Sequence, residues 1–252
     1  MIFDKEVALF GDSKLIKEGS SIQLTNSESG SEGRVLYKEP INLFQDVETG
    51  NSLSFTSSFR FSMPNETDDV MAFVMVPTSM DLRLFNQRGN SSSALGFLFE
   101  HAKNEQVVAF EFDISNRGNH ARILVGKPES SEVRNLSFKG NLLMANGGTL
   151  SCMIEYKASA KRMQVRFRKL GSIKMMDPSF DFYVDLAEIL KGGECMVGLS
   201  STNGNSSKAH ILHSWNFDIW PPVQVVVPPS RLMHPLPIKG GKIVVSKCER
   251  GP

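Results

Sequence analysis

The sequence is poor in cysteine and has no long apolar run, and both shortages exclude classes of protein. Its 252 residues contain three cysteines, Cys152, Cys195 and Cys248, which are too few for a disulfide scaffold and are not spaced like zinc ligands. A Cys152–Cys195 bridge and two buried free thiols are both left open. No stretch of about 18 apolar residues occurs, so no membrane span is expected. The first residues, MIFDKEV, lack the pattern of a signal peptide.

An excess of charge of either sign is also missing. Lys and Arg number 28 against 27 Asp and Glu, which gives a net charge of +1. Such a chain has no overall field that attracts nucleic acid or anionic lipid, so nucleic acid is not an expected partner. The main basic cluster, from Lys161 to Lys169, alternates with Val165 and Phe167 as the wet face of a strand would.

The common catalytic patterns are absent as well. Five histidines are scattered, no Gly-x-Ser-x-Gly elbow occurs, and no Gly-rich phosphate loop lies between a strand and a helix. The segments GNSSSALG and STNGNSS are rich in Gly and Ser, but as loops between strands they lack a helix N-terminus to hold an anion. We therefore do not expect an enzyme.

What the sequence does contain is period-two alternation of apolar and polar residues. In LSFTSSFRFSM, from Leu53 to Met63, the apolar side chains share one face, which predicts a half-buried strand. The pattern returns in CMIEYKA, MQVRFRKL and HSWNFDIW, whereas MAFVMV, residues 71–76, is apolar on both faces and predicts a central strand. Of the whole chain, DLAEILKGG alone has a short helical spacing. These features predict an all-β sandwich of two large antiparallel sheets.

The alternation ends at Trp220. From Pro221 onward the chain reads PPVQVVVPPSRLMHPLPIKGGK, where proline removes backbone donors and no alternation survives. We predict one domain over residues 1–220 and a poorly ordered Pro-rich linker or tail over residues 221–252.

One segment, FEFDISNRGNHARILVG, residues 110–126, gathers acids, amides and a histidine. On a strand, Glu111 and Asp113 emerge on one face about 7 Å apart, opposite two phenylalanines. A solvated polar face is the simplest interpretation. A hard-metal site is the second, because carboxylate oxygens suit calcium and manganese, and an imidazole such as His120 suits manganese. The third is glycoside hydrolysis, which needs two carboxylates.

The hydrolase interpretation lacks a residue. Sandwich-fold glucanases carry Glu-x-Asp-x-(x)-Glu on one strand, but the residues four and five positions after Glu111 are Ser115 and Asn116. Since the second catalytic Glu is missing, the best case for an enzyme is removed.

Seven segments follow one another over residues 2–220: IFDKEVALFGDSKLI, GRVLYKEPINLF, SLSFTSSFRFSM, DDVMAFVMVP, VVAFEFDISN, FYVDLAEILKGGECMVGLSSTNG and HILHSWNF. Together and in this order they resemble the legume-type (L-type) lectins and the lectin ectodomains of plant receptor-like kinases. DDVMAFVMVP is similar to the family motif Asp-Gly-Leu-Ala-Phe-Phe-Leu, and the last two segments are similar to its closing Val-Gly-Phe-Ser-Ala-Ser-Thr-Gly and Trp-Ser-Phe motifs.

The resemblance implies a concanavalin A-like jelly-roll sandwich with a shallow sugar site on a concave face. It also implies calcium and manganese as cofactors that lock the loops, glycans or glycoproteins as partners, and an extracellular or plasma-membrane-associated location. Four glycosylation triplets favour the same location, where composition alone gives about two; they begin at Asn65, Asn90, Asn135 and Asn205. Flat exposed sheets suggest a homodimer.

The resemblance assigns sugar-binding positions only in part. Asp69 matches the sugar-binding Asp, although Val70 stands where the family has Gly. Ser93, next to Ser92, stands where the family has the Gly whose N–H meets the sugar. Asn116 and Asn205 are the further sugar-binding positions that we assign, Asn205 because it lies in the loop from Asn203 to Ser207, where specificity would lie.

The implied metal ligands are Glu111, Asp113 and His120, together with an amide for which we assign Asn119, with Asn116 as the alternative. The loop between them lacks the family's aromatic residue and its second Asp, which bridges both ions. A site without that carboxylate has less negative charge to offset two divalent cations, so we expect weakened or lost metal dependence, with a metal-free domain as the limit. Arg117 as a fixed cation in the vacated space is a hypothesis.

Two functions therefore compete. The first is a carbohydrate-binding L-type lectin domain, in a plant cell-surface recognition ectodomain, with altered metal dependence. The second is a degenerate lectin fold that acts as an interaction or receptor domain for a non-sugar ligand. The loop from Ser115 to His120 separates them.

Overall fold

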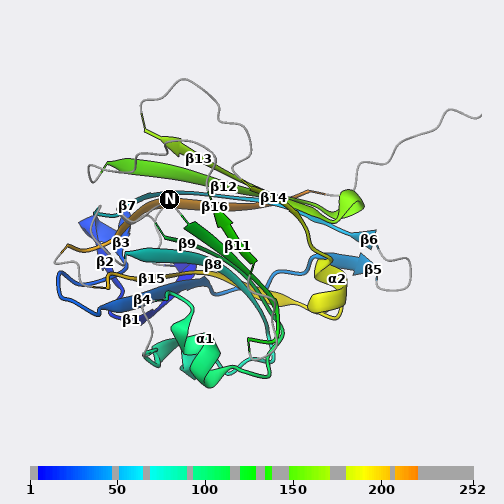
Figure 1. The fold of residues 1–252 in the computed structure, drawn as a ribbon, viewed down its shortest axis with the longest axis horizontal. Coiled ribbons are helices and arrows are strands. Elements are labelled where there is room, and N and C mark those ends of the chain that lie inside the picture. The colour runs from blue at the N-terminus through cyan, green and yellow to red at the C-terminus, as the bar shows by residue number, and fades with distance from the viewer. Residues whose placement is uncertain are drawn as a thin grey trace, which may run out of the picture. The chain divides into compact units, whose positions relative to one another are not determined.

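The alternating segments form two seven-stranded antiparallel sheets that pack face to face (Figure 1). The structure is a computed structural model that describes residues 5–46, 51–64, 69–89, 93–113, 120–128, 134–137, 148–170, 180–204 and 208–220. The first sheet has the order β1 (Val7–Gly11), β4 (Glu32–Tyr37), β15 (Cys195–Thr202), β8 (Val70–Pro77), β9 (Val107–Asp113), β10 (His120–Gly126), β11 (Arg134–Ser137). The second has the order β14 (Phe180–Tyr183), β13 (Arg162–Lys169), β12 (Thr149–Lys157), β7 (Ser54–Ser62), β16 (Ile211–Trp220), β3 (Ser21–Gln23), β2 (Lys14–Ile16).

The remaining elements are short. β5 (Phe44–Asp46) pairs with β6 (Asn51–Ser52), and the 3-10 turns are η2 (Lys17–Gly19), η3 (Leu82–Asn86) and η4 (Ala158–Ala160). Among the described residues the α-helices are α1 (Gly96–His101) and α2 (Leu186–Ile189). α2 begins at the predicted helical spacing, where the Asp185 carboxylate accepts from the Ala187 and Glu188 N–H groups.

The predicted strands are confirmed. In β7, alternate residues from Phe55 to Phe61 are buried and the residues between them are not. β8 is the middle strand of the first sheet and is buried on both faces from Val70 to Val76, as an uninterrupted apolar run requires. β12 and β13 pair in antiparallel register and are connected through η4. Cys152 and Cys195 are both buried free thiols, so the bridge between them does not form.

The first sheet is covered on both faces. Between the sheets lies the main core, which is rich in aromatic rings and contains Trp215, whose Nε1 donates to the Ser57 hydroxyl at 3.0 Å. A second core lies on the outer face of the first sheet, where apolar residues from 80–89 and 93–102 pack on Ala72, Val74 and Ala109. Figure 1 shows α1 on this outer side. We call residues 78–89 and 93–106 the covering segment.

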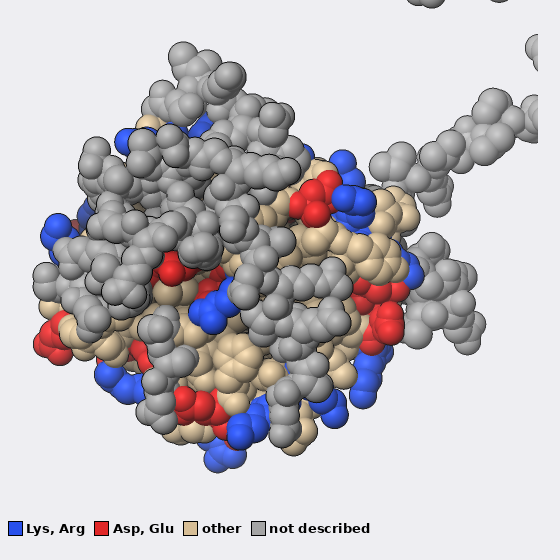
Figure 2. All heavy atoms as spheres, viewed as in Figure 1, with Lys and Arg blue, Asp and Glu red and all other residues tan. Residues whose placement is uncertain are grey.

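The surface and the chain ends bear on the other predictions. On the described part of the face in Figure 2, Lys and Arg lie among Asp and Glu without a continuous field of one sign. Within the described residues, no helix is long and apolar enough to cross a membrane. β16 ends at Trp220, and the predicted tail, residues 221–252, lies outside the described residues, so the domain boundary stays a prediction.

Gly33 of β4 allows a close backbone approach that any side chain would prevent. A Cβ at Gly33 would lie 1.7 Å from the Leu24 carbonyl oxygen. We expect Gly33→Ala to lower the free energy of unfolding by about 3 kcal/mol or more, because backbone must move to admit the methyl group. Gly148→Ala is the matched control, since its Cβ would first meet Lys169 Cε at 3.6 Å. Urea unfolding of both variants measures the difference, and equal costs would contradict the prediction.

Candidate functional site

Four strand ends meet at one end of the first sheet. β9 ends at Asp113, which is opposite Val70 at the start of β8 and opposite His120 at the start of β10. Val70 is in turn opposite Thr202, the last residue of β15. Asp69 directly precedes Val70. The fold therefore brings three of the predicted site residues, Asp69, Asp113 and His120, to neighbouring positions, and we call this place the strand-end site.

Glu111 lies one pleat back from the strand end, and its carboxylate is fully engaged by protein groups. The side chain is 2% exposed, because the covering segment lies over this face of the sheet; the expectation of a solvated polar face is wrong here. Oε1 is ion-paired with Arg122, its cross-strand neighbour in β10. Oε2 accepts from the Ser93 hydroxyl and, at 3.2 Å, from the Leu95 N–H.

The surroundings of Glu111 change the pKa of its carboxyl in two opposite directions. Burial raises the pKa of the Glu111 carboxyl, while Arg122, the Ser93 hydroxyl and the Leu95 N–H lower it part of the way back. Burial is the largest effect, so the pKa is raised overall. A charged carboxylate at this place depends on the guanidinium beside it.

The described residues do not fit the calcium and manganese pair that the resemblance implies. A divalent cation at Glu111 would lie beside the fixed positive charge of Arg122 and would compete with the donors that already use both carboxylate oxygens. Within the described part of the chain, no group of three or more His, Cys, Asp or Glu residues is arranged to hold a metal ion.

Several predicted site residues lie outside the described residues. These are Asn116, Asn119 and Asn205, together with the hypothetical fixed cation Arg117. For His120 the backbone is described, as the first residue of β10, but the side chain is not. The roles of these residues stay predictions.

Asp69, the predicted sugar-binding acid, is fully buried beside a histidine. Its Oδ1 lies 3.2 Å from His210 Nε2, and His210 Nδ1 lies 2.7 Å from the Ser201 hydroxyl. The order Ser, His, Asp is that of a hydrolase triad. However, none of the three residues is more than 1% exposed, so a substrate does not reach the hydroxyl. The contacts instead connect the start of β8, the end of β15 and the segment before β16.

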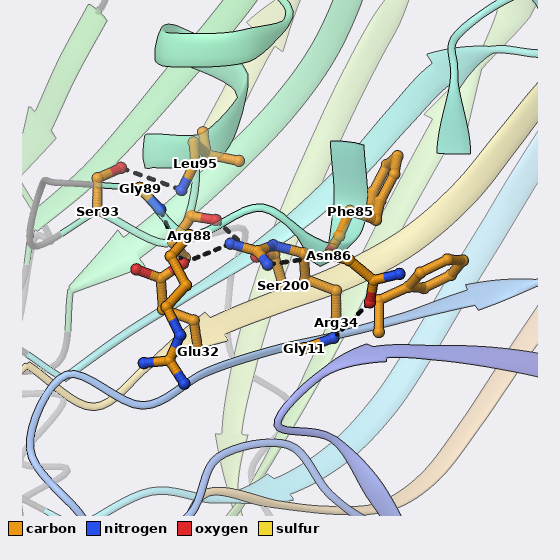
Figure 3. A network of polar contacts seen from close by, with 12 residues as sticks. Gly11, Glu32, Arg34, Phe85, Asn86, Arg88, Gly89, Ser93, Leu95 and Ser200 are labelled. Carbon is orange, nitrogen blue, oxygen red and sulfur yellow. Dashed lines mark hydrogen bonds and ion pairs between the residues drawn. The ribbon is translucent and has the colours of Figure 1, made fainter. Parts of the chain in front are cut away.

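The covering segment is anchored at a second buried ion pair (Figure 3). Arg34 of β4 is 1% exposed; its Nη2 is 2.5 Å from Glu32 Oε2, and its Nη1 donates to the Phe85 carbonyl at 2.9 Å. Glu32 also accepts from the Gly89 N–H at 3.2 Å. The Arg34 guanidinium lies 4.1 Å from the ring centre of Phe97. Burial lowers the pKa of Arg34, and Glu32 raises it part of the way back.

Asn203, the residue after β15, fixes the loop between β3 and β4. Its side-chain amide donates to the carbonyl oxygens of Asn26 and Glu28, each at 2.8 Å, and its Oδ1 accepts from the Ser31 N–H at 2.9 Å. Because all these atoms are used within the chain and Asn203 is 0% exposed, this residue holds the loop rather than a ligand.

Sequence reasoning missed Arg122, Arg34 and His210. Arg122 lies in the alternating segment ARILVG and reads as a solvated strand residue; only the register that sets it opposite Glu111 reveals its role. A partial signal existed, since a basic residue on a strand beside an acidic one suggests a cross-strand pair. His210, in the segment HILHSWNF, offered no such signal.

Known proteins with similar sequences belong to one family. The model of the legume lectin domain matches residues 2–227. Agglutinin-2 of Cladrastis kentukea is 27% identical over 229 residues, 85% of this chain and 76% of that protein. L-type lectin-domain containing receptor kinase S.7 of Oryza sativa subsp. japonica is 25% identical over 260 residues, 92% of this chain and 36% of the kinase.

Solved structures agree. Basic winged bean lectin with Tn-antigen aligns with a TM-score of 0.66 at 25% identity, covering 86% of this chain and 94% of that one. The lectin UEA-II complexed with galactose aligns with a TM-score of 0.65 at 25% identity, covering 85% and 93%. The predicted jelly-roll sandwich is thereby confirmed.

We expect Arg122→Gln to destabilise the fold more at neutral than at acidic pH. Breaking a fully buried pair costs roughly 3–5 kcal/mol, and because the Arg122 side chain is 40% exposed we expect about 2 kcal/mol at pH 7. Without Arg122 the pKa of Glu111 rises further above its unfolded value. A carboxyl with a raised pKa favours the native state when protonated, so the cost shrinks as the pH falls toward about 4.5. Urea unfolding across this pH range measures it.

Two further variants serve as controls for the Arg122→Gln experiment. Glu111→Gln combined with Arg122→Gln leaves no unpaired charge at this position and should recover at least half of the lost stability at pH 7. Arg162→Gln, which breaks the half-exposed pair with Asp181, should cost less than about 1 kcal/mol at every pH. A cost for Arg122→Gln that equals this control, or that does not depend on pH, would sink the assignment.

Proposed function

The chain belongs to the legume lectin domain family, and from this premise we propose that it is a carbohydrate-binding L-type lectin domain. The strand-end site supports this proposal, because the ends of four strands meet there and Asp69, the residue that matches the family's sugar-binding acid, lies within it. A shallow site gains selectivity when its donors and acceptors are fixed before the ligand arrives. The function is binding rather than catalysis.

We further propose that sugar binding depends weakly, or not at all, on calcium and manganese. The observation that carries this proposal is the Arg122–Glu111 ion pair. The resemblance assigns Glu111 as a metal ligand, but its carboxylate is paired with the guanidinium of the protein's own Arg122. The same carboxylate accepts from Ser93 and Leu95 of the covering segment. The protein's own guanidinium would thus do the ordering that metals do elsewhere.

The proposed setting is a cell-surface recognition ectodomain. Its support is the similarity to the rice receptor kinase, of which this chain spans 36%, and the excess of glycosylation triplets. The partners in this setting are glycans or glycoproteins. A homodimer through an exposed sheet remains part of the proposal.

One observation favours the second candidate, a lectin fold that binds a non-sugar ligand. The Asp69 carboxylate is 0% exposed and lies 3.2 Å from His210 Nε2. A sugar hydroxyl reaches this carboxylate only if the surrounding residues shift. The two candidates therefore differ in whether glycan binding exists at all.

A glycan array with and without metal tests the proposal directly. The chain is dialysed against EDTA, and half is then supplied with calcium and manganese. We expect specific glycan signals that agree within about two-fold between the two samples, because chelation does not remove Arg122 and the fold gains little from added ions. A lectin known to need calcium serves as the control on the same slides. Binding that appears only with metal contradicts the metal proposal, and no binding in either sample favours the second candidate.

A pair of variants tests the role of Asp69. Asp69→Asn and His210→Gln break the same contact, but only the first removes the carboxylate acceptor. We expect Asp69→Asn to lose at least about ten-fold in glycan affinity, the range for a hydrogen bond to a charged group, while His210→Gln loses less than about three-fold. Titration calorimetry measures affinity, and thermal unfolding confirms that both variants are folded. Equal losses would show that the contact acts on the fold and not on the sugar.

A further inference from the structure

The outer face of the second sheet carries a line of alternating arginine and serine residues. In the register of β13, β12, β7 and β16, Arg168 is opposite Ser151, Ser151 is opposite Arg60, and Arg60 is opposite Ser214. Strand spacing puts the backbones of the two arginines about 10 Å apart, with one serine between them. Their alternate neighbours in the same strands, Phe167 and Phe59, are buried in the main core, so the arginines face outward.

A second line runs beside the first, two residues further along each strand. It consists of Arg166, Met153, Ser58 and Asn216. The two lines together line a groove of about 530 Å³, which we call the second-sheet groove. Its side chains are short hydroxyls and an amide, an apolar methionine and three guanidinium groups. This volume is in the range of small-molecule sites and exceeds that of a single inorganic anion.

The charge that the described side chains bring to the groove is positive and only partly compensated among them. Arg166 is neutralised, because its Nη1 lies 3.0 Å from Glu155 Oε2. Arg60 donates from Nε to the Ser214 hydroxyl at 3.0 Å, which orients its guanidinium, and no described carboxylate pairs with Arg60 or Arg168. The charge of Arg60 also acts on a nearby histidine. Burial lowers the pKa of His213, and the positive charges of Lys17 and Arg60 lower it further.

Each part of this lining matches a part of one ligand class. Guanidinium groups bind carboxylate or sulfate oxygens through paired N–H donors. Serine hydroxyls and an asparagine amide both donate and accept, as sugar hydroxyls require, and a methionine offers apolar surface to the C–H face of a ring. We propose that the second-sheet groove binds an acidic oligosaccharide, with its carboxylate or sulfate held between Arg60 and Arg168 over Ser151.

This site goes beyond the strand-end site and is independent of it. The strand-end site belongs to the first sheet, and the groove lies on the outward face of the second, with the main core between the two sheets. A chain that binds no neutral glycan at the strand ends would still bind an acidic saccharide in the groove. The two proposals can therefore fail separately.

Titration calorimetry on the whole chain tests the proposal with four probes of stated chemistry. These are an oligogalacturonate for carboxylate, a heparin-derived tetrasaccharide for sulfate, a neutral maltotetraose and inorganic sulfate. We expect at least one acidic saccharide to bind more tightly than inorganic sulfate, and its affinity to fall with added salt. The carboxylate and sulfate probes distinguish the two possible sources of the anion. The variant Asp69→Asn should bind the acidic saccharide as the parent does.

The variants assign the binding to the groove. Arg60→Gln combined with Arg168→Gln should weaken acidic saccharide binding by about ten- to hundred-fold, since two charge-assisted contacts are lost. Arg162→Gln is the matched control, because Arg162 lies on the same strand as Arg168 and faces the same way but is paired with Asp181 at 2.7 Å. It should change the affinity less than about two-fold.

Three outcomes would overturn the proposal. They are no binding of either acidic saccharide, binding that the double variant leaves unchanged, and inorganic sulfate that binds as tightly as the saccharides. Sedimentation of the parent and the double variant adds a fourth. If the parent is a dimer and the double variant a monomer, the groove is an interface between copies of this chain and not a saccharide site.

Discussion

A carboxylate that leaves water must be paired, and two carboxylates of the first sheet meet this requirement in the same way. Glu32 is paired with Arg34, and Glu111 with Arg122. Each also accepts an N–H from the covering segment, Glu32 from Gly89 and Glu111 from Leu95. The covering segment thus buries the two acids and at the same time satisfies them. Removing either arginine would leave an unpaired buried carboxylate, which would destabilise the second core as a whole.

This constraint shapes the proposed binding site. A metal ion orders a loop only while it is bound, so the order depends on ion concentration and on pH. A guanidinium that belongs to β10 is covalently attached and so is present at a fixed stoichiometry. In the proposed function, the segment that begins at Ser93 is therefore ordered by the fold itself. The acid–base pair across β9 and β10 is what makes an L-type lectin domain without tight metal sites physically reasonable.

Much of the fold could be predicted from the sequence, because its information is local. The alternation of β7, the doubly apolar run of β8 and the turn between β12 and β13 each depend on neighbours in sequence. The chemistry of the strand ends depends on register between distant segments. The segment ARILVG alone does not show that Arg122 lies opposite Glu111. The covering segment has little regular secondary structure, so no sequence pattern indicates that it buries that acid. The resemblance identified Glu111 and Asp69 as important positions, but not the partners that define them.

The two sheets differ in what lies on their outer faces, and the difference follows from side chains at alternate positions. Outward positions of β8 and β9 include Ala72, Val74 and Ala109, which are small or apolar, and Glu111, whose charge is paired with Arg122, so this face accepts the covering segment. Outward positions of β7 and β13 include Arg60 and Arg168, whose charges a dry cover would have to desolvate at a cost of several kcal/mol each. One face is therefore closed by its own chain, and the other is suited to an anionic ligand. The same period-two rule that builds the sandwich also decides where it can bind.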